Sequence, residues 1–438
     1  MTPNPFLHGN PVPPSHFTNR TRDLRRLVNR TITGQSTAVV GEPRTGKTSL
    51  LEYLRAREMQ AELYGHNAAS LIFFYMDSHL LGPEFTQSQF WQNALSPLYD
   101  QIIAGKGENT RIAQAYRICV ENQFGNFVLE RLFGLVEQAK FRLVLLLDEF
   151  DTLLHHPILN SAEFFGGLRS LASRSRGALI MITASRQSLS VLNRETQEIN
   201  WSGSPYFNFL DEIVLGPFDE RSVSQLLMRA EDRFNAEDYQ FLARVGGGHP
   251  YLLQVAASAL WEAYEEESDA FQRRKYAGEE LFDNAAAILT DTWRLWSKEM
   301  KKAFTVIALG HSSLMVGKSF DVGELTRELP ALAPEVRTLL KQGYITEDAG
   351  YAAGYRIRPE AFLWWLSEEL IRTVREGGPS SEVAFEDWLR VQEWDGLVKT
   401  GEKEQLNKAA RALGGVLKDG IQTFIKAAAE GVAKGLTG

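Results

Sequence analysis

The sequence predicts an α/β fold, in which a parallel sheet covered by helices precedes a mostly helical second half. Short runs that are apolar along their whole length alternate with helical patterns up to about residue 216. Strands of a parallel sheet have this composition because helices cover both of its faces. After residue 218 the patterns are helical up to about Trp296, so we expect a separate helical region there.

The predicted strands are spaced so that helices fit between them. We expect strands at residues 37–40, 71–76, 143–147 and 178–184. A helix is predicted from about Lys47 to Met59, and a long helical stretch covers about 85–139 with a break near 105–108. Strands that alternate with helices in this way are typical of a parallel sheet with helices on both sides.

Length and composition limit the class of protein. The chain has 438 residues, of which 44% are hydrophobic and 23% charged, so it is expected to form about two to four domains with cores of their own. Its 47 Lys and Arg against 55 Asp and Glu leave a net charge of −8, which offers no general surface for a nucleic acid. The single cysteine, Cys119, excludes an internal disulfide, and neither a signal-peptide pattern nor a membrane-length apolar run is present. We therefore expect a cytoplasmic protein.

The turn after the first strand carries a phosphate-binding motif. It matches G-x-x-x-x-G-K-[ST] with residues Gly41, Glu42, Pro43, Arg44, Thr45, Gly46, Lys47 and Thr48. The glycines let backbone N–H groups surround a phosphate, and the following helix adds its positive N-terminal end. We expect Lys47 to contact the β- and γ-phosphates, Thr48 to hold Mg²⁺, and Ser49 to belong to the same nucleotide site.

The strand at residues 143–147 ends in two acidic residues, Asp148 and Glu149. Ligands of open α/β sheets bind at the carboxyl ends of the strands. We expect Asp148 to be the Mg²⁺ partner and Glu149 to act as the general base that polarises the attacking water. The alternative is that both carboxylates merely cap the next helix. Together with the phosphate-binding motif, the acidic pair predicts a P-loop NTPase.

The last predicted strand also ends in polar residues, Ser185 and Arg186. We expect them to lie beside Asp148 and to sense the γ-phosphate; the alternative is a helix cap and a solvated base. No Asn-Lys-x-Asp motif is present to select guanine, which favours ATP and ADP as the nucleotides.

In their order along the chain, these motifs resemble the STAND branch of AAA+-like ATPases, which includes NACHT and NB-ARC proteins, and the ATPase module of archaeal origin-recognition initiators. Further matches are Phe17-Thr18-Asn19-Arg20, Asp148-Glu149-Phe150-Asp151, Thr183-Ala184-Ser185-Arg186, Leu215-Gly216-Pro217-Phe218 and the segment 246–253. The resemblance implies that Asn19 and Arg20 border the adenine and that Arg186 touches the terminal phosphate. It also implies that Pro250 packs on the base. For His249 three alternatives stay open: it senses the phosphate, caps a helix or packs against the adenine.

Two features depart from the family pattern. Asn19 stands where the family has glycine, and no clear arginine finger follows Arg186. Arg194 is a candidate finger, although a solvated surface arginine is the simpler interpretation. Without a finger, hydrolysis is expected to be slow, so that the nucleotide acts as a switch.

The resemblance and the composition together predict five segments. They are a P-loop ATPase core (1–216), a helical lid (217–295), a winged-helix domain (296–375), a linker (376–383) and an α-helical C-terminal tail (384–438). The candidate recognition helix of the winged helix is Ala333 to Lys341. Residues 295–375 hold 11 Lys and Arg against 10 Asp and Glu, so nucleic-acid binding is not expected and contact with the nucleotide-binding module is favoured.

The tail carries an apolar stripe with helical spacing. Its positions are Leu406, Ala410, Leu413, Leu417, Ile421, Phe424, Ala428, Val432 and Gly435, after an aromatic cluster of Phe385, Trp388, Leu389 and Trp394. Three alternatives remain open: docking on the chain's own ATPase, self-assembly with other tails, and peripheral contact with a membrane surface. Residues 405–438 hold five Lys and Arg against two Asp and Glu, which makes the tail the expected site of an unknown protein partner.

We therefore predict a cytoplasmic signalling ATPase that binds ATP or ADP with Mg²⁺ and hydrolyses ATP slowly. ATP is expected to open the chain, favour a homo-oligomer and produce an output through residues 384–438. Fold-level analogy suggests a role in bacterial defence or stress signalling. The alternatives are a DNA-binding initiator- or transposition-type AAA+ ATPase that uses the winged helix, and a structural module with an inactive site.

Overall fold

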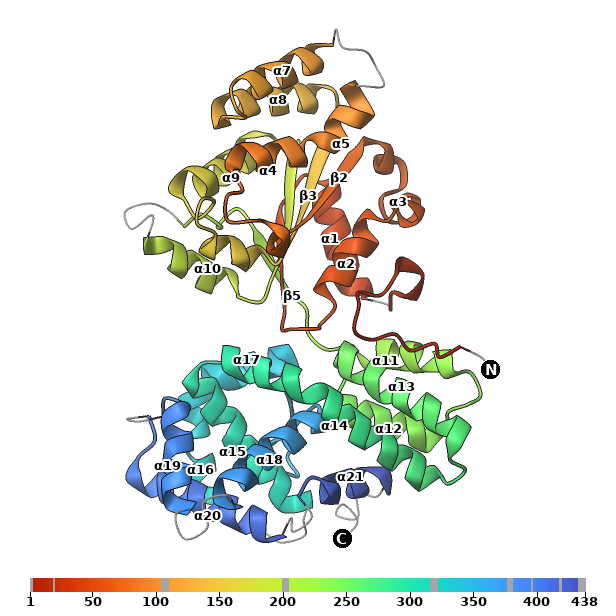
Figure 1. Cartoon of the computed structure of the whole chain (residues 1–438), viewed down its shortest axis with the longest axis vertical. Helices are drawn as coiled ribbons and strands as arrows, with labels where there is room; N and C mark the ends of the chain where they lie inside the picture. The colour runs from red at the N-terminus through yellow and green to blue at the C-terminus, as the bar shows by residue number, and fades with distance from the viewer. Residues whose placement is uncertain are drawn as a thin grey trace. The chain divides into compact units, whose positions relative to one another are not determined.

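The chain forms two compact units, each with a core of its own (Figure 1). The sheet unit consists of Pro11–Glu42 and Gly46–Leu215, and the helical unit of Met1–Asn10, Pro43–Thr45 and Gly216–Gly438. The computed structural model describes residues 3–18, 20–103, 110–198, 205–315, 322–375, 381–394, 397–416 and 420–431.

The sheet unit is built on five parallel strands in the spatial order β2-β3-β4-β1-β5. The strands are β1 (Thr37–Val40), β2 (Leu71–Asp77), β3 (Arg142–Asp148), β4 (Leu179–Ser185) and β5 (Asp211–Val214). β4 lies between β1 and β3, so that Val40 pairs with Ser185, while Asp77 of β2 pairs with Asp148. Because the strands are parallel, the motifs that follow β1, β3 and β4 meet at one edge of the sheet.

Helices cover both faces of this sheet, as the apolar strands predict. The helices are α1 (Thr21–Ile32), α2 (Lys47–Arg55), α3 (Arg57–Tyr64), α4 (Gln87–Ala94), α5 (Ser96–Leu98), α7 (Arg111–Glu121), α8 (Asn126–Gln138), α9 (Ala162–Arg174) and α10 (Leu189–Glu195). Val39 and Ile182 pack with α1, α2 and α3, whereas Ala38 and Met181 pack with α4, α8 and α9. Successive residues of a strand face opposite sides, so a strand covered on both sides must be apolar throughout.

Two details of the sheet unit differ from the sequence prediction. The helix expected from Lys47 to Met59 is two helices, because Ala56 has a non-helical backbone (φ −59°, ψ 124°). β5 is an additional strand at the sheet edge; its sequence is Asp-Glu-Ile-Val and only Ile213 is buried, so it lacks the apolar run by which the other strands are predicted. The expected helix break at 105–108 lies outside the described residues.

Most of the helical unit follows the sheet unit along the chain, from Gly216 onward. Its elements are α11 (Glu220–Leu227), α12 (Ala236–Gly246), α13 (Pro250–Glu266), α14 (Ala270–Leu295), α15 (Lys298–Met315), α16 (Gly323–Thr326), α17 (Ala333–Gln342), β6 (Ile345–Glu347), β7 (Tyr355–Ile357), α18 (Glu360–Arg375), α19 (Ser381–Val391), α20 (Thr400–Val416) and α21 (Gln422–Ala429). Helices followed by the antiparallel hairpin β6–β7 occur in the order expected for a winged helix. The assignment of a winged helix itself stays a prediction, as does the role of α17 as its recognition helix.

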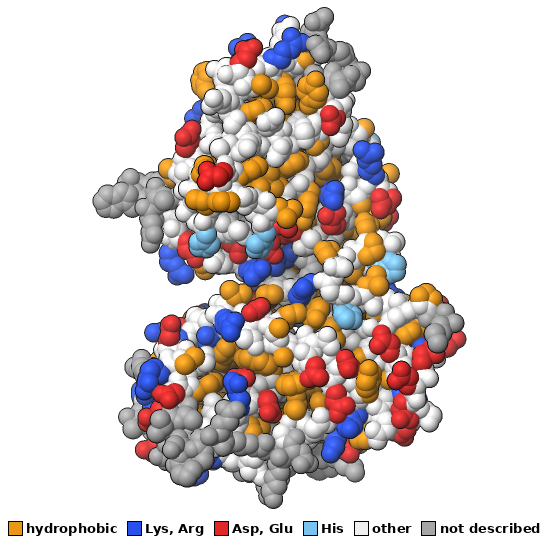
Figure 2. Space-filling model, viewed as in Figure 1, with side chains coloured by type: hydrophobic (Ala, Val, Ile, Leu, Met, Phe, Trp, Pro, Cys, Tyr) orange, Lys and Arg blue, Asp and Glu red, His pale blue; other side chains and the backbone are white. Residues whose placement is uncertain are grey.

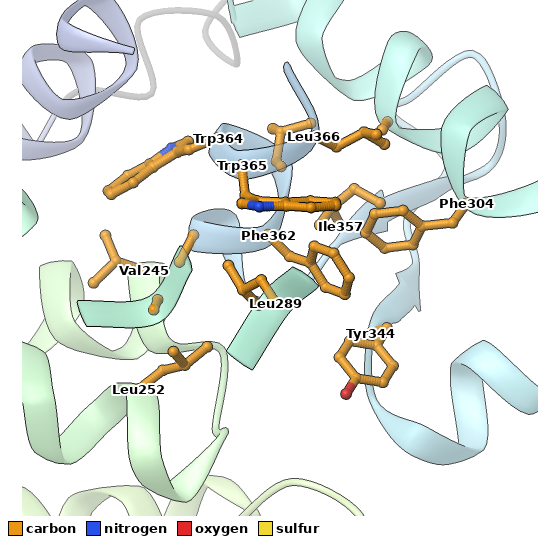
Figure 3. Close-up of a cluster of buried hydrophobic side chains, with 14 of the residues drawn as sticks. Val245, Leu252, Leu289, Phe304, Tyr344, Ile357, Phe362, Trp364, Trp365 and Leu366 are labelled. Atoms are coloured by element: carbon orange, nitrogen blue, oxygen red, sulfur yellow. The ribbon is translucent and has the colours of Figure 1, made fainter. Parts of the chain in front are cut away.

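Aromatic side chains form the centre of the helical unit's core (Figure 3). The ring of Phe362 on α18 lies 4.7 Å from that of Phe304 on α15 and 5.1 Å from that of Trp296, measured between centroids. The rings of Tyr344 and Trp365 each lie 5.5 Å from Phe362. The ring of Trp293, in the predicted lid, lies 5.7 Å from that of Trp365, so the predicted lid and the predicted winged helix share one core.

The described residues of the tail pack into this same core. Buried tail residues include Phe385, Leu389, Trp394, Leu406, Ala410, Leu413, Phe424 and Ala428. The stripe divides between two helices, because α20 ends at Val416, α21 begins at Gln422 and Gly420 between them has a left-handed backbone (φ 60°). Of the three alternatives for the tail, the structure shows docking on its own chain; Leu417, Val432 and Gly435 lie outside the described residues. Among the described residues, no helix combines the length and the apolar character needed to cross a membrane.

Polar contacts to buried side chains also hold the tail. Lys302 Nζ on α15 lies 3.1 Å from Glu402 Oε1 on α20, and these side chains are 6% and 11% exposed. Arg274 on α14 donates from Nε to the carbonyl of Ala429 at the end of α21 (2.8 Å). The last carbonyls of a helix have no partner within it, so this arginine satisfies one of them from outside.

Candidate functional site

The phosphate-binding motif forms the connection between β1 and α2. The N–H of Gly41 donates to the carbonyl of Ser185 (3.2 Å), which ties the start of the loop to β4. Gly46 has a left-handed backbone (φ 92°) and precedes Lys47, the first residue of α2, without a side-chain cap on the helix. Arg44, which is exposed, also has a positive φ of 61°. The loop therefore leads into a helix N-terminus that no side chain caps, which is a suitable environment for an anion.

Among the described residues, the hydrogen-bond partners of the buried Lys47 ammonium group are backbone carbonyls. Its side chain donates from Nζ to the carbonyls of Gly41 (2.8 Å) and Glu42 (3.1 Å), and the residue is 6% exposed. Burial lowers the pKa of Lys47, while the nearby carboxylates of Glu149, Asp148 and Asp151 act in the opposite direction. Within the described part of the chain, none of these carboxylates comes within ion-pair distance of Nζ. The ammonium group can therefore exchange its carbonyl partners for phosphate oxygens.

Asp148 and Thr48, the two residues expected to hold Mg²⁺, lie together. Asp148 is 2% exposed at the end of β3, and burial raises the pKa of its carboxyl group. A hydrogen bond from the Thr48 side chain opposes that rise in pKa, so the two side chains are in contact. They meet although β4 lies between β3, which ends at Asp148, and β1, which leads into the loop before Thr48. A hydroxyl oxygen and a carboxylate are hard oxygen donors of the kind that Mg²⁺ prefers. These residues fit a nucleotide-bound Mg²⁺.

Glu149, the predicted general base, pairs with the predicted sensor arginine. Arg186 Nε lies 3.3 Å from Glu149 Oε2, and the two side chains are 39% and 21% exposed. Glu149 also has a left-handed backbone (φ 48°), which turns the chain sharply after β3. Ser185 is fully buried, and its hydroxyl donates to the carbonyl of Gln187 (2.8 Å). This hydrogen bond stabilises the turn that contains Arg186.

Other predicted site residues in the sheet unit have local partners. Ser49 accepts a hydrogen bond from the N–H of Val12 (3.1 Å), so its hydroxyl holds the N-terminal segment against α2. Arg20 is 7% exposed, with Nη1 3.6 Å from Asp23 Oδ2. Arg194 is exposed on α10. Asn19 lies outside the described residues.

His249 and Pro250 lie in the helical unit, where they precede and begin α13. The glycines before them have a packing role. A Cβ at Gly247 would approach the Cα of Pro359 to 2.5 Å, and one at Gly248 would approach the carbonyl of Phe218 to 2.7 Å; both glycines have positive φ. Tight packing within the helical unit therefore accounts for the glycines of this segment, while the roles of His249 and Pro250 toward a nucleotide stay predictions.

Two residues at the site have no role in the sequence prediction. Tyr75 of β2 donates from its hydroxyl to Asp148 Oδ2 (3.1 Å). Asp151 has a buried Oδ1 without a hydrogen-bond partner among the described residues, and its charge acts on Lys47. Asp151 stands in the acidic motif after β3 and could have been found there. Tyr75 belongs to no motif, because its contact depends on the pairing of β2 with β3.

The strand order and the loop between β1 and α2 define a P-loop NTPase fold. More specifically, the chain belongs to the AAA-like domain family, a model of which matches residues 20–286. No curated protein matches the chain significantly.

Several solved structures of other proteins are similar to this chain. A Walker-type ATPase of Pyrococcus abyssi is 17% identical with a TM-score of 0.50, covering 83% of this chain and 99% of that one. An ORC2 protein of Aeropyrum pernix in its ADPNP–ADP complexes is 16% identical with a TM-score of 0.47, covering 82% and 95%. A STAND protein with a tetratricopeptide repeat sensor from Pyrococcus horikoshii is 14% identical with a TM-score of 0.33, covering 93% and 54%. The Pyrococcus abyssi structure agrees with this fold, and at 17% identity it shows the fold alone.

Proposed function

We propose that the chain binds ATP with Mg²⁺, hydrolyses it slowly, and uses the bound nucleotide as a switch. The observation that carries this proposal is the convergence of Lys47, Thr48, Asp148 and Glu149 at one edge of the sheet. Membership of the AAA-like family and the fold shared with a Walker-type ATPase support it.

Each residue has a distinct task in this proposal. The backbone of residues 41–46 and the start of α2 bind the phosphates, and Lys47 exchanges its bonds to Gly41 and Glu42 for phosphate oxygens. Thr48 and Asp148 would hold Mg²⁺. When bound, the ion would neutralise the negative charge that develops on the phosphate oxygens during hydrolysis. Glu149 takes a proton from the attacking water.

The contact between Arg186 and Glu149 supports slow hydrolysis. While Arg186 Nε lies 3.3 Å from Glu149 Oε2, the guanidinium group occupies an oxygen of the carboxylate that would otherwise accept the proton of the attacking water. A terminal phosphate beside Arg186 would compete for the guanidinium group. Occupancy of the γ-phosphate position would then be coupled to the base, as a nucleotide switch requires.

The wider role that we propose is signalling. ATP would favour an open, homo-oligomeric form, with an output through residues 384–438 to an unknown protein partner or a membrane surface. Because the described tail is buried, such an output requires the tail to leave the core of the helical unit. A role in bacterial defence or stress signalling rests on analogy with the fold family. The cytoplasmic location that we propose rests on the single cysteine of the chain, Cys119.

DNA binding through the predicted winged helix has less support. On the face of the helical unit shown in Figure 2, basic and acidic side chains are interspersed. α17 carries the basic residues Arg337 and Lys341 and, in its first turn, the acidic residue Glu335. Phosphate contacts provide most of the non-specific affinity for DNA, so a surface of mixed charge is expected to bind duplex poorly. Tight duplex binding with a steep salt dependence would favour this alternative.

The binding of ATP and ADP to the full chain and to Lys47→Ala tests the proposal. We expect the substitution to weaken nucleotide affinity by about 10- to 100-fold, because it removes a charged hydrogen-bond donor. Lys140→Ala is the matched control, since that side chain is 84% exposed, and it should bind nucleotide as the parent does.

Glu149→Gln should retain ATP without hydrolysing it. Size-exclusion measurements with ADP and with a non-hydrolysable ATP analogue should reveal the oligomer. A parent chain that binds neither nucleotide would contradict the proposal.

A further inference from the structure

Tyr75 connects the predicted metal carboxylate to the strand beside it. It lies on β2, and its hydroxyl donates to Asp148 Oδ2 at 3.1 Å. The other carboxylate oxygen, Oδ1, accepts the backbone N–H of Glu149 at 3.0 Å. Both oxygens of Asp148 therefore have a fixed donor, one from the backbone and one from a neighbouring strand.

The tyrosine ring is itself held by α2. The guanidinium carbon of Arg55 lies 5.0 Å from the centre of the Tyr75 ring, within the range of a cation–π contact. Arg55 pairs with Glu52 through two hydrogen bonds of 2.8 and 2.9 Å. Glu52 and Arg55 belong to the helix that begins at Lys47, so the ring is fixed by the element that carries the phosphate-binding loop.

The contact between Tyr75 and Asp148 has a fixed direction, because the phenol hydroxyl donates and the carboxylate oxygen accepts. Asp148 is 2% exposed, so the donors that reach its two oxygens define how the carboxylate is oriented.

We propose that Tyr75 is a positioning residue of the magnesium site, whose hydroxyl holds the Asp148 carboxylate in the orientation in which Asp148 and Thr48 accept Mg²⁺ with the nucleotide. The inference rests on the proposed function of this site. Hydrogen-bond partners of metal ligands orient those ligands, and their loss typically lowers metal affinity by about 10- to 100-fold. Tyr75 acts through Asp148 and is not expected to touch the nucleotide.

The test compares Tyr75→Phe with the parent as full-length chains. Binding of a non-hydrolysable ATP analogue is measured while Mg²⁺ is titrated, and again in EDTA. We expect the Mg²⁺ concentration at half-saturation to rise about 10-fold. Affinity in EDTA should not change, because the phosphate-binding loop is intact. Tyr64→Phe is the matched control: its hydroxyl donates to the carbonyl of Leu54 (3.1 Å) in the same unit, so it loses a hydrogen bond without affecting Asp148.

A double variant separates positioning from a structural role. In an Asp148→Asn background, Tyr75→Phe should cause no further change in the Mg²⁺ requirement, because the metal carboxylate is already absent. An unchanged Mg²⁺ midpoint for Tyr75→Phe alone would overturn the inference, as would an equal loss of affinity in EDTA. If the parent itself binds no analogue at any Mg²⁺ concentration, the proposed function fails; if it binds and only the tyrosine effect is missing, the proposed function stands and this inference alone is lost.

Discussion

In the helical unit, the buried ammonium group of Lys302 contacts a buried carboxylate, whereas the buried ammonium group of Lys47 in the sheet unit donates to two backbone carbonyls. Lys302 Nζ has both oxygens of Glu402 at 3.1 and 3.2 Å. Lys47 Nζ lies near three carboxylates, with none at ion-pair distance among the described residues. A buried charge whose partner belongs to the protein stabilises one arrangement of the chain. A buried charge without such a partner costs stability and retains its attraction for an external ion.

The largest effect should follow from breaking the pair in the helical unit. Lys302→Met would leave the Glu402 carboxylate buried without its cation, and removing one partner of a buried ion pair costs about 3–5 kcal/mol. We expect the free energy of unfolding in urea to fall by this amount and α20 to become sensitive to limited proteolysis.

An exposed pair in the same unit provides the control for this comparison. Arg390 and Asp387 on α19 lie 2.9 Å apart, but their side chains are 68% and 56% exposed. Arg390→Met should therefore change the free energy of unfolding by less than about 1 kcal/mol. Equal effects of the two substitutions would mean that burial does not distinguish these pairs.

A smaller effect on the free energy of unfolding should come from His311, a buried group that the fold keeps neutral. The Nδ1 of His311 on α15 accepts the N–H of Ile357 on β7 (3.1 Å), which requires an uncharged ring nitrogen. Burial, with Arg356 and Arg244 nearby, lowers the pKa of His311 from 6.5 to about 3.

The sign of the resulting pH dependence follows from that lowered pKa. Between pH 6.5 and 3 the unfolded chain binds a proton that the folded chain does not, so stability falls as the pH falls. From pH 7 to pH 5 the parent should lose about 2 kcal/mol more than His311→Gln does. Glu360, whose pKa is raised by burial, is present in both proteins, so its contribution cancels in the difference. If the free energies of unfolding of the parent and of His311→Gln changed equally with pH, His311 would have to be protonated equally in the folded and the unfolded chain.

The smallest effect tests the sheet unit. Because burial raises the pKa of Asp148, its ionised form costs stability at every pH above its ordinary pKa of 3.8. Asp148→Asn should therefore raise the free energy of unfolding at neutral pH by about 1 kcal/mol, while nucleotide binding should require a higher Mg²⁺ concentration. Thermal unfolding without nucleotide and a Mg²⁺ titration measure the two effects. Destabilisation by this substitution would show that Asp148 is a structural residue.

Much of the candidate site could be predicted because its residues follow strands. Lys47 and Thr48 belong to a local motif, and Asp148 and Arg186 follow apolar runs whose ends must meet once the sheet is parallel. Tyr75 could not be predicted, because its hydroxyl reaches Asp148 only through the pairing of β2 with β3. The packing role of Gly247 and Gly248 could not be predicted either, since the atoms of Pro359 and Phe218 that lie against them come from distant parts of the sequence.

The sequence by itself determined the α/β class, the phosphate-binding loop and the acidic strand end, because periodicity and short motifs are local properties of a chain. Only the tertiary structure decided where the tail lies. An apolar stripe requires that one helix face be buried, but it does not specify what covers that face. In the fold, Phe424 and Ala428 pack into the core of the helical unit, and Arg274 binds the last turn of α21. The pairing of Lys302 with Glu402 was likewise invisible in the sequence, because 99 residues separate two side chains that only packing brings together.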